Sequence, residues 1–583
     1  MLKSSAEPLT VLAKRFLEPS NATHRQYEAL RAYFVEGVPS HAAAARFGYT
    51  PGSFRILCHQ FRHDPTRAFF LPSAKGPRPT PARDRIRETV VMLRKQNLSM
   101  YDISRALMAQ GTPRSPVAVS VILKEEGFAK LPRRHDDERP AGPHGTVAAV
   151  ADVRELDLSP RQIRTQFGGL FLFAPFLAQI PLETIVRTAG LPGTRMIPAA
   201  HAMRALLGLK LYGTRRHSHV MAEVLDEGLA LFAGLNVIPK RSFLTEYSCR
   251  IAPDSYPKLM RAWFEAVNQL GLPRGTSFDL DFHTIPFHGE DALVQKHYVS
   301  KRSRRQKGIL AFVAQDAATR VFCYANGQLR KETQTQEVLQ FVAFWKARTG
   351  HLPEELIFES RLTSYANLSK LNQQGIAFIT LRRRSRQLVA AIYQAPVSAW
   401  RRIELEGVSR VYKTPRILDQ RIRLPHYKGE LRQLAILDLG HEEPTLLLTN
   451  QLRRSPAKLI TRYAQRMVIE NQLAEGINFF HMDALSSAVP MKVNCDLQLT
   501  IMASSLYRLL GVKLGNGYAE AKADHIFRDL VDATALVRLT DKEIEVRFQK
   551  RAHNPLLLAA GLQTSAPPIP WLGGKRLRLV FGE

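Results

Sequence analysis

The sequence predicts an α/β protein in which a mixed sheet, flanked by helices and carrying a β-rich insertion, follows several all-α domains. Three observations predict this class. At 583 residues the chain is too long for one core, because single hydrophobic cores stop growing near about 250 to 300 residues. Helical spacing of apolar residues dominates the chain up to about Leu270. After Pro273, short strand-like runs begin and then alternate with helices.

The first expected elements are two sets of three short helices. Residues 23–65 contain breaks at Gly37 and Gly48, where a left-handed helix end favours glycine, and a third helix starts at Thr50-Pro51. The same design returns in helices expected over 83–95 and 99–110 and in a third helix opened by Ser115-Pro116. The pattern indicates tandem helix-turn-helix units over residues 20–70 and 80–130.

In such units the third helix enters the major groove of double-stranded DNA. Arg55 and His59 in the first unit, and Arg114 and Lys124 in the second, would then reach bases or phosphates. The alternative is a pair of plain three-helix packing modules that bind no DNA.

Two further helical regions are expected before the sheet. Residues 131–146 are rich in proline, glycine and charge and are expected to form a linker. Residues 147–272 show helical apolar spacing, as in Met203, Leu206, Leu207 and Leu211, and predict an all-helical connector domain.

The α/β domain is expected over residues 273–387 and 456–515. Its predicted strands are 277–285, 309–314, 320–325, 355–358 and 376–381, with helices at 335–349 and 364–373. Residues 388–455 are strand-rich and are predicted to form a β insertion, and residues 516–583 are a C-terminal segment without an assigned fold.

The charge of the chain indicates a polyanionic partner. Lys and Arg number 82 against 52 Asp and Glu, which gives a net charge of +30. Such a field attracts nucleic acid, and double-stranded DNA is the expected partner. Basic clusters occur at 133–134, 301–307, 382–386 and 453–454, and the second of these contains Arg302, Arg304 and Arg305. Any one cluster is equally well explained as a solvated surface, so the prediction rests on the overall excess.

Other classes of protein are excluded by composition. The four cysteines contain no CxxC pair, which excludes a zinc ribbon and argues against a disulfide framework. No apolar run reaches 18 residues, and the first residues lack a signal-peptide pattern. The expected location is the cytoplasm, in association with the nucleoid.

Carboxylates occur at three places in the predicted α/β domain. Asp279 and Asp281 are two residues apart on the first strand, so both project from one face. Glu359 ends the fourth strand at the carboxyl edge, where open sheets place their sites. Glu470 follows Tyr463 and Arg466 at a spacing that puts all three on one helical face.

Three converging carboxylates suit hard cations, because Mg²⁺ prefers oxygen ligands. Asp281, Glu359 and Glu470 could hold Mg²⁺, with Mn²⁺ as a substitute, in a two-ion site for phosphoryl transfer. The residues leave the choice between Asp279 and Asp281 open. Read singly, each carboxylate is a surface or capping residue, and Glu470 is also placed to pair with Arg466.

The series Tyr463, Arg466 and Glu470 matches a Y-x-x-R-x-x-x-E helix signature. Residues 270–515 resemble insertion-sequence transposases with an RNase H-like DDE catalytic domain, a family with the same order of strand Asp, second carboxylate, β insertion and Glu helix. The resemblance implies metal-dependent cleavage at the ends of an insertion sequence and transfer of the 3′-hydroxyl to target DNA. It implies Asp281 or Asp279, Glu359 and Glu470 as the triad, Tyr463 and Arg466 as phosphate contacts, and a homodimer assembled on DNA.

Two positions depart from the family pattern. The family has Asp where this chain has Glu359, and Lys where it has Ile477. A carboxylate displaced by about 1 Å can lose about 100-fold in rate, so Glu359 leads to the hypothesis that this copy is weakened or inactive. The alternatives are therefore a transposase-derived DNA-binding protein without full activity, and a nuclease that cuts DNA without strand transfer.

Four other polar residues near the first strand are expected to serve simpler roles. His283, His288 and His297 are spaced too irregularly for a metal site and are expected to lie in loops or on a DNA-facing surface. Asp316 is expected to stabilise the turn between the second and third strands.

Overall fold

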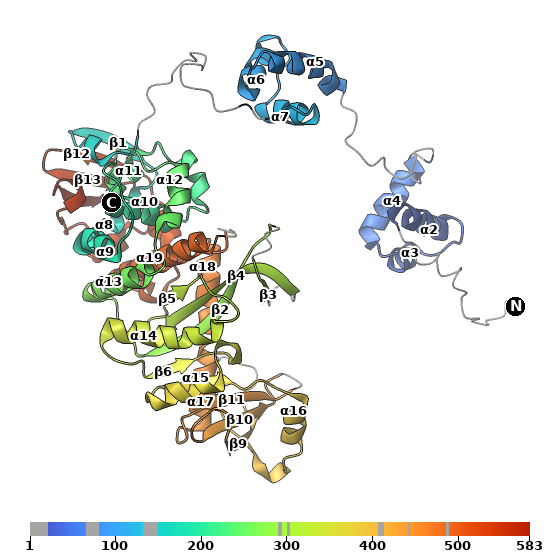
Figure 1. Cartoon of the computed structure of the whole chain (residues 1–583), viewed down its shortest axis with the longest axis vertical. Helices are drawn as coiled ribbons and strands as arrows, with labels where there is room; N and C mark the ends of the chain where they lie inside the picture. The colour runs from blue at the N-terminus through green and yellow to red at the C-terminus, as the bar shows by residue number, and fades with distance from the viewer. Residues whose placement is uncertain are drawn as a thin grey trace. The chain divides into compact units, whose positions relative to one another are not determined.

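The computed structural model divides the chain into two compact units, residues 1–144 and 145–583 (Figure 1). The structure describes residues 21–63, 65, 81–129, 131, 150–289, 294–299, 304–405, 413–440, 443–484 and 489–582. Each unit is described by itself.

The first unit contains two sets of three helices, as the sequence predicts. The first set is α2 (Ala22–Phe34), α3 (Ser40–Arg46) and α4 (Pro51–His63), and the second is α5 (Pro81–Lys95), α6 (Met100–Ala109) and α7 (Pro116–Glu125). Gly37 and Gly48 both have positive φ, which explains why α2 and α3 end before them. The side chains of Ser99 and Ser115 accept backbone N–H groups at the starts of α6 and α7.

Each set of helices has its own small core. In the first set Phe54 packs among alanines of α2 and α3, and in the second Val90 packs with Ile103 and Val119. These apolar residues recur at helical spacing, so each helix turns one face inward and leaves the other to solvent.

The second unit begins with a largely helical region. Its helices are η2 (Val153–Glu155), η3 (Gly168–Leu172), α8 (Ala174–Gln179), α9 (Leu182–Ala189), α10 (Ala199–Leu211), η4 (His217–Ala222), α11 (Glu227–Ala233), α12 (Arg241–Tyr247), η5 (Ser248–Arg250) and α13 (Ser255–Gln269). No single described helix has both the length and the apolarity to cross a membrane, although the bent pair Gly168–Gln179 and Leu182–Ala189 has them in combination.

The prediction that this region is entirely helical is wrong. Residues Arg161–Thr165 form strand β1, in which Ile163 and Thr165 are buried and their neighbours are not. β1 pairs with the C-terminal strands β12 (Ala535–Leu539), β13 (Glu543–Phe548) and β14 (Arg576–Phe581) in the order β1-β12-β13-β14. Five residues of alternating burial are too short a signal to stand out beside long helices.

The central sheet contains ten strands. They are β2 (Ser277–Pro286), β3 (Lys296–Val299), β4 (Arg304–Asp316), β5 (Phe322–Asn326), β6 (Glu355–Ile357), β7 (Ala377–Leu381), β8 (Trp400–Arg402), β9 (Arg416–Ile422), β10 (Leu431–Leu437) and β11 (Thr445–Thr449). Their order is β3-β4-β2-β6-β7-β11-β10-β9-β8, and β5 also pairs with β4. β2 is antiparallel to β4 but parallel to β6, and β6 is parallel to β7, so the sheet is mixed as predicted.

The expected β insertion continues this sheet. β11 pairs antiparallel with β7, with Leu448 opposite Thr380, and β10, β9 and β8 follow in turn. The segment starts with helix α16 (Arg386–Tyr393), so the prediction of strand from residue 388 onward is wrong at its beginning. Ser385 caps this helix by accepting the backbone N–H of Leu388, a start signal present in the sequence.

Helices cover both faces of the sheet. On one face, α14 (Glu337–Thr349) packs Trp345 on Phe278 of β2 with ring centroids 4.4 Å apart, and α15 (Tyr365–Gln373) lies beside it (Figure 1). On the other face, α17 (Pro456–Gln465) packs Leu459 and Ile460 against Ile357 and Ile379, and α18 (Val468–Asn478) follows it over β2. The second face is the one from which Asp279 and Asp281 project.

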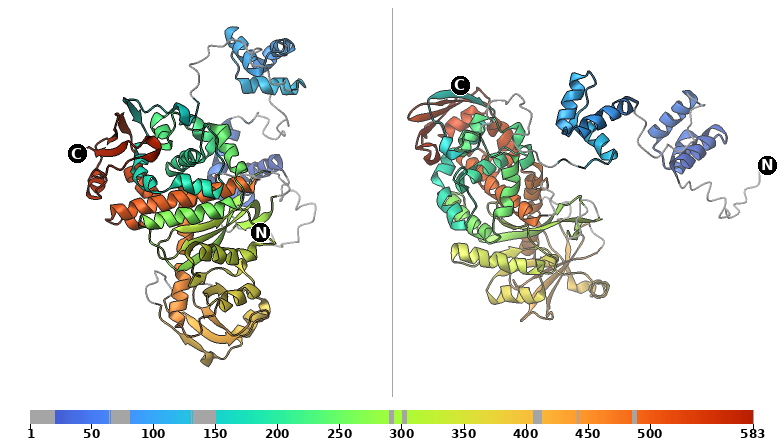
Figure 2. Two further views of the ribbon diagram at one scale, coloured as in Figure 1. Left: turned by 60° about the vertical axis from the view of Figure 1, so that its left-hand side comes forward. Right: turned by 45° about the horizontal axis from the view of Figure 1, so that its top comes forward.

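A long buried helix joins the sheet to the helical region. α19 (Pro490–Leu514) contacts β5, α10 and α13, and Figure 2 shows it running beside α13. The indole of Trp263 on α13 donates to Ser505 Oγ on α19. α20 (Ala523–Ile526), the π-helix Phe527–Val531 and α21 (Asn554–Ala559) then lead into and through the C-terminal sheet.

Candidate functional site

A row of paired polar side chains crosses the face of β2 that lies under α17 and α18. Alternate residues of a strand share a face, and three such residues of β2 each meet a partner from residues 456–484. The pairs are Asp279 with Arg462 at 2.8 Å, Asp281 with Arg466 at 3.4 Å and His283 with Asp483 at 2.7 Å.

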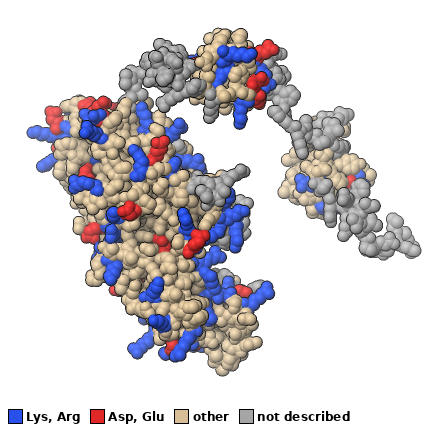
Figure 3. All heavy atoms as spheres, viewed as in Figure 1, with Lys and Arg blue, Asp and Glu red and all other residues tan. Residues whose placement is uncertain are grey.

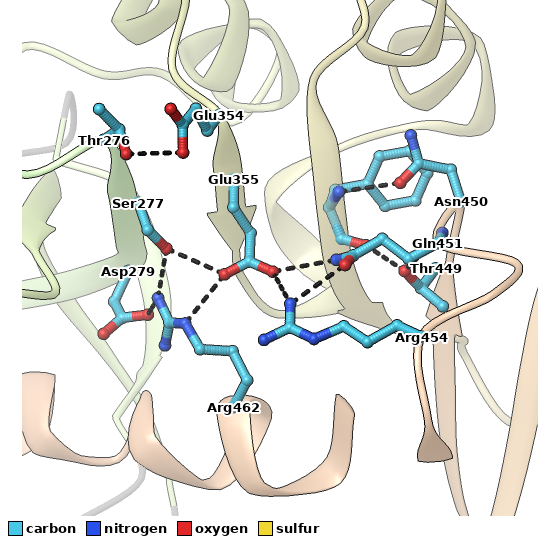
Figure 4. Close-up of polar contacts among 11 residues, drawn as sticks. Thr276, Ser277, Asp279, Glu354, Glu355, Thr449, Asn450, Gln451, Arg454 and Arg462 are labelled. Carbon is cyan, nitrogen blue, oxygen red and sulfur yellow. Dashed lines mark hydrogen bonds and ion pairs between the residues drawn. The ribbon is translucent and has the colours of Figure 1, made fainter. Parts of the chain in front are cut away.

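Asp279 belongs to a buried network. Arg462 Nη2 lies 2.8 Å from Asp279 Oδ1 and donates to Ser277 Oγ at 2.9 Å, while Arg462 Nε donates to Glu355 Oε2 at 3.0 Å (Figure 4). Burial raises the pKa of Asp279, although the charge of Arg462 opposes the shift. Asp279 is only 3% exposed and its partner fills the space in front of it.

Glu355 joins that network to the strand end of the insertion. Its carboxylate accepts Gln451 Nε2 at 3.0 Å and pairs with Arg454 Nη1 at 2.5 Å (Figure 4). Burial alone would raise the pKa of Glu355, but the hydrogen bond from Gln451 and the charges of Arg462 and Arg454 lower it overall. The network thus ties α17 to β2, β6 and the segment after β11.

Asp281 lies in a second cluster with Arg466 and Glu359. Arg466 is 4% exposed, and its Nη1 lies 3.4 Å from Asp281 Oδ2 while its Nη2 lies 2.9 Å from Glu359 Oε1. The sheet register explains the meeting: Asp279 is opposite Ile357 on parallel strands, so two residues further Asp281 comes beside Glu359. The guanidinium therefore bridges the two carboxylates.

Glu470 approaches the same place from α18, where it is exposed. Burial raises the pKa of Asp281 to about 6; the charge of Arg466 opposes this shift, and the charges of Glu359 and Glu470 add to it. Asp281 and Glu359 thus share one guanidinium, and Glu470 lies near enough for its charge to influence Asp281. Between the two aspartates that sequence left open, Asp281 is the one in this cluster.

The raised pKa predicts how Asp281 affects stability. An acid whose pKa is higher in the folded state contributes stability below its ordinary pKa near 4, and that contribution is lost as pH rises through about 6. In metal-free buffer, Asp281→Asn should therefore stabilise the protein at pH 7, on the order of 1 to 3 kcal/mol, with little difference at pH 4. Urea unfolding at several pH values measures the effect.

Asp419→Asn is the matched control for that experiment. The pKa of Asp419 is lowered, because the hydrogen bond and charge of Arg432 outweigh burial. This variant should lose stability at pH 7. A loss for Asp281→Asn as well would contradict the prediction.

The helix that carries Tyr463, Arg466 and Glu470 is interrupted. α17 ends at Gln465 and α18 begins at Val468, and the backbone N–H groups of Arg466, Met467, Ile469 and Glu470 each donate to the residue three before. The expectation of one continuous helical face is therefore wrong, because this tighter turn rotates Glu470 relative to Tyr463. The ring of Tyr463 still lies 5.7 Å from the Arg466 guanidinium.

The carboxylates as arranged here do not form a metal site. Among the described residues, no group of three His, Cys, Asp or Glu side chains is placed to hold an ion. The space between Asp281 and Glu359 is taken by the Arg466 guanidinium, which pairs with both.

The structure places the expected DNA-contacting residues on several surfaces. Arg55 on α4, Lys124 on α7 and Arg305 on β4 are exposed, as is His59 on α4. Arg114 is half-buried before α7, and its Nη1 donates to Pro113 O. Arg302 lies outside the described residues, and the structure describes Arg304 only as the first residue of β4. Tyr463 and Arg466 lie in the acidic cluster instead of on an open surface.

The three histidines near β2 do not meet. His283 pairs with Asp483, His297 is buried, which lowers its pKa to about 4, and His288 is exposed. Asp316 accepts the backbone N–H groups of Gly275 and Ala318, which confirms its predicted turn role.

Sequence reasoning missed Arg462, Glu355 and Asp483. Arg462 is one helical turn before Arg466, and Asp279 is two residues before Asp281, so the paired spacing was a usable signal for a second ion pair. Asp483 carried no such signal. Ile477, at the position where the family has Lys, packs against the main core.

Positive charge predominates on the visible surface of the second unit. Figure 3 shows Lys and Arg side chains spread over this face, with few Asp and Glu between them. Several of the exposed arginines, such as Arg421 and Arg423 near Glu430, belong to β9 and its following loop. A surface of this kind favours a polyanion.

Fold and cluster together define a mixed α/β protein with an acidic site on the sheet face under α17 and α18. No protein-family model matches this chain, and no curated protein sequence does either. The chain is similar to the piggyBac transposase in a cryo-EM synaptic complex with hairpin DNA, at 11% identity and a TM-score of 0.36, over 64% of this chain and 82% of that chain. A likeness this distant does not establish a family.

Proposed function

We propose that this protein is a DNA transposase that cleaves phosphodiesters at the ends of an insertion sequence and transfers the 3′-hydroxyl to target DNA. The observation that carries the proposal is that Asp281 of β2 and Glu359 at the end of β6 share the Arg466 guanidinium, with Glu470 of α18 near enough to influence Asp281. Three carboxylates from distant parts of a chain with net charge +30 suit chemistry on a phosphate backbone.

The strand order supports the same reading. β5, β4 and β2 are antiparallel neighbours, and β6 and β7 follow in parallel on the other side of β2. This is the order of an RNase H-like domain, with carboxylates on its first strand, after its fourth strand and on a later helix. Strands β8 to β11 form the insertion between β7 and the helix.

The residue roles follow from position. Asp281, Glu359 and Glu470 are the proposed ligands for Mg²⁺ or Mn²⁺, and Tyr463 and Arg466 the proposed phosphate contacts. Asp279 is proposed as a structural residue, because Arg462 pairs with its carboxylate and both side chains are buried. The exposed residues of α4 and α7 are proposed to bind duplex DNA, and two subunits to assemble on two DNA ends, where bound DNA offsets their charge repulsion.

Glu359 favours one alternative, a transposase-derived protein that binds DNA without cutting it. Glu has one methylene more than the Asp found in the resembled family, and here its carboxylate pairs with Arg466 at 2.9 Å. The third possibility, a nuclease without strand transfer, shares the acidic site.

One assay separates the three. Purified protein is incubated with Mg²⁺ or Mn²⁺ and DNA that carries the sequences flanking its gene, and then with precut ends that bear a free 3′-hydroxyl. Cleavage and joining support the transposase, cleavage without joining supports the nuclease, and tight binding without either reaction supports the DNA-binding protein.

Replacement of Glu359 tests the effect of side-chain length. Glu359→Asp should raise the rate of cleavage by about tenfold or more, because a reacting group displaced by about 1 Å can lose about 100-fold. The side chain is 44% exposed, so the shorter residue fits without a core cavity. Single-turnover cleavage measures the rate, and Glu359→Gln, which keeps the length but loses the charge, should be inactive. Equal rates for the wild type and Glu359→Asp would refute the idea.

A further inference from the structure

Two arginines one helical turn apart lie beside the aspartates of β2. They differ in how many of their N–H groups have a hydrogen-bond partner. Arg462 donates hydrogen bonds to Glu355 and Ser277 and pairs with Asp279. Arg466 is equally buried, yet its Nε and Nη1 have no hydrogen-bond partner among the described residues. Its Nη1 has the 3.4 Å ion pair with Asp281 and its Nη2 bonds to Glu359, while the Tyr463 side chain lies beside the guanidinium.

Unsatisfied donors on a buried guanidinium point to a missing acceptor. Leaving buried N–H groups unpaired costs about 1 to 3 kcal/mol, and more for charged groups. A guanidinium presents its donors as a planar fork that matches the oxygens of a phosphate. Arg466 therefore has capacity for a phosphate that Arg462 does not have.

We propose that Arg466 is an exchangeable counter-ion, which pairs with Asp281 and Glu359 in the free protein and moves to a DNA phosphate in the complex. The inference rests on the proposed function of this site. Once Arg466 has left, Asp281 and Glu359 face each other without a neutralising charge and are free to bind a divalent cation. DNA thereby controls whether the metal site exists.

The local backbone allows this exchange. Arg466 lies at the junction of α17 and α18, where hydrogen bonds three residues apart replace the regular helical pattern. Such mid-helix tightening often marks a hinge. Meanwhile Arg462 fixes α17 on the sheet through Glu355 and Asp279, so the Arg466 side chain can turn without moving the helix that carries it.

Exchange of this kind makes DNA and metal binding mutually dependent. If DNA raises the affinity for the cation, the cation raises the affinity for DNA by the same factor. Coupling between two sites typically amounts to about 5- to 150-fold, which an equilibrium titration resolves.

The test is a Mn²⁺ titration of the full chain, with free Mn²⁺ measured by electron paramagnetic resonance. Wild-type protein should bind Mn²⁺ about tenfold or more tightly when a short random-sequence duplex is present. Asp281→Asn with the same duplex is the control for ions held by DNA alone, and it should show no such gain. This comparison needs no change at Arg466.

Replacement of Arg466 gives the second arm. Arg466→Gln should bind Mn²⁺ about tenfold or more tightly than the wild type without DNA, and adding DNA should raise its affinity further by less than about twofold. Arg416→Gln removes one positive charge from β9, where it pairs with Asp438, and should behave as wild type. Thermal melts verify that each variant is folded.

The outcomes separate this inference from the proposed function. DNA-dependent Mn²⁺ binding that Asp281→Asn abolishes supports the exchange, whether or not DNA is cleaved. Equal Mn²⁺ binding with and without DNA, or no Mn²⁺ binding in either state, overturns it. Mn²⁺ binding without cleavage or joining would instead count against the transposase.

Discussion

Glu470→Gln is expected to lower metal-dependent DNA cleavage more than about 100-fold while DNA affinity changes less than about twofold. Residues that only support a metal ligand already cost about 10- to 100-fold when they are changed, so a ligand itself should cost more. Glu470 is well suited to this test, because it is exposed on α18 and forms no salt bridge with a described residue. Its loss should therefore leave the fold intact.

Single-turnover cleavage measures the rate, and fluorescence anisotropy with labelled duplex measures affinity. Glu520→Gln is the matched control: this glutamate is also exposed and lies in the turn after α19, and its loss should leave the rate unchanged. Cleavage by Glu470→Gln at the wild-type rate would remove this residue from the site. Asp281→Asn should match the loss seen for Glu470→Gln.

Arg462→Ala is expected to lower the free energy of unfolding of the second unit by about 3 to 5 kcal/mol. Removing one partner of a buried ion pair leaves an uncompensated charge, and losses of that size are typical. Here Asp279 and Glu355 would both lose their shared cation, and α17 would lose its polar attachment to β2 and β6. Urea unfolding followed by tryptophan fluorescence reports on this unit, since it contains Trp263, Trp345, Trp400 and Trp571.

An exposed pair on the same sheet provides the comparison. Arg401→Ala breaks a bond to Asp419 near the outer edge, and surface ion pairs contribute about 0 to 1 kcal/mol. Adding Asp279→Asn to Arg462→Ala should recover part of the loss, because one uncompensated charge then disappears. A loss below about 1 kcal/mol for Arg462→Ala would mean that the network does not hold α17.

The sequence was sufficient to predict those elements whose formation depends on residues close together in the chain. The serines before α6 and α7 and the glycines after α2 and α3 set those helices, and Asp279 and Asp281 share a face because strands alternate. Contacts between distant residues depend instead on how the strands are paired. Asp281 meets Glu359 only because β2 lies parallel to β6, a pairing across about 80 residues that spacing along the chain does not contain.

The misses have the same origin. β1 is a five-residue strand whose partner is β12, more than 350 residues later, and the helices near it in sequence carry no signal for that pairing. The interruption after α17 depends on hydrogen bonds three residues apart, which apolar periodicity does not distinguish from a regular helix.

The pairing of β1 with β12 also affects the order in which the two units can fold during synthesis. A ribosome releases Arg161–Thr165 long before Ala535–Leu539, and until then β1 has no strand to bind. The two sets of helices in the first unit need only nearby contacts and can fold as they emerge, whereas the second unit must wait until β12 has been made. A nascent chain would thus complete its two sets of helices early and the β1-β12-β13-β14 sheet of the second unit late.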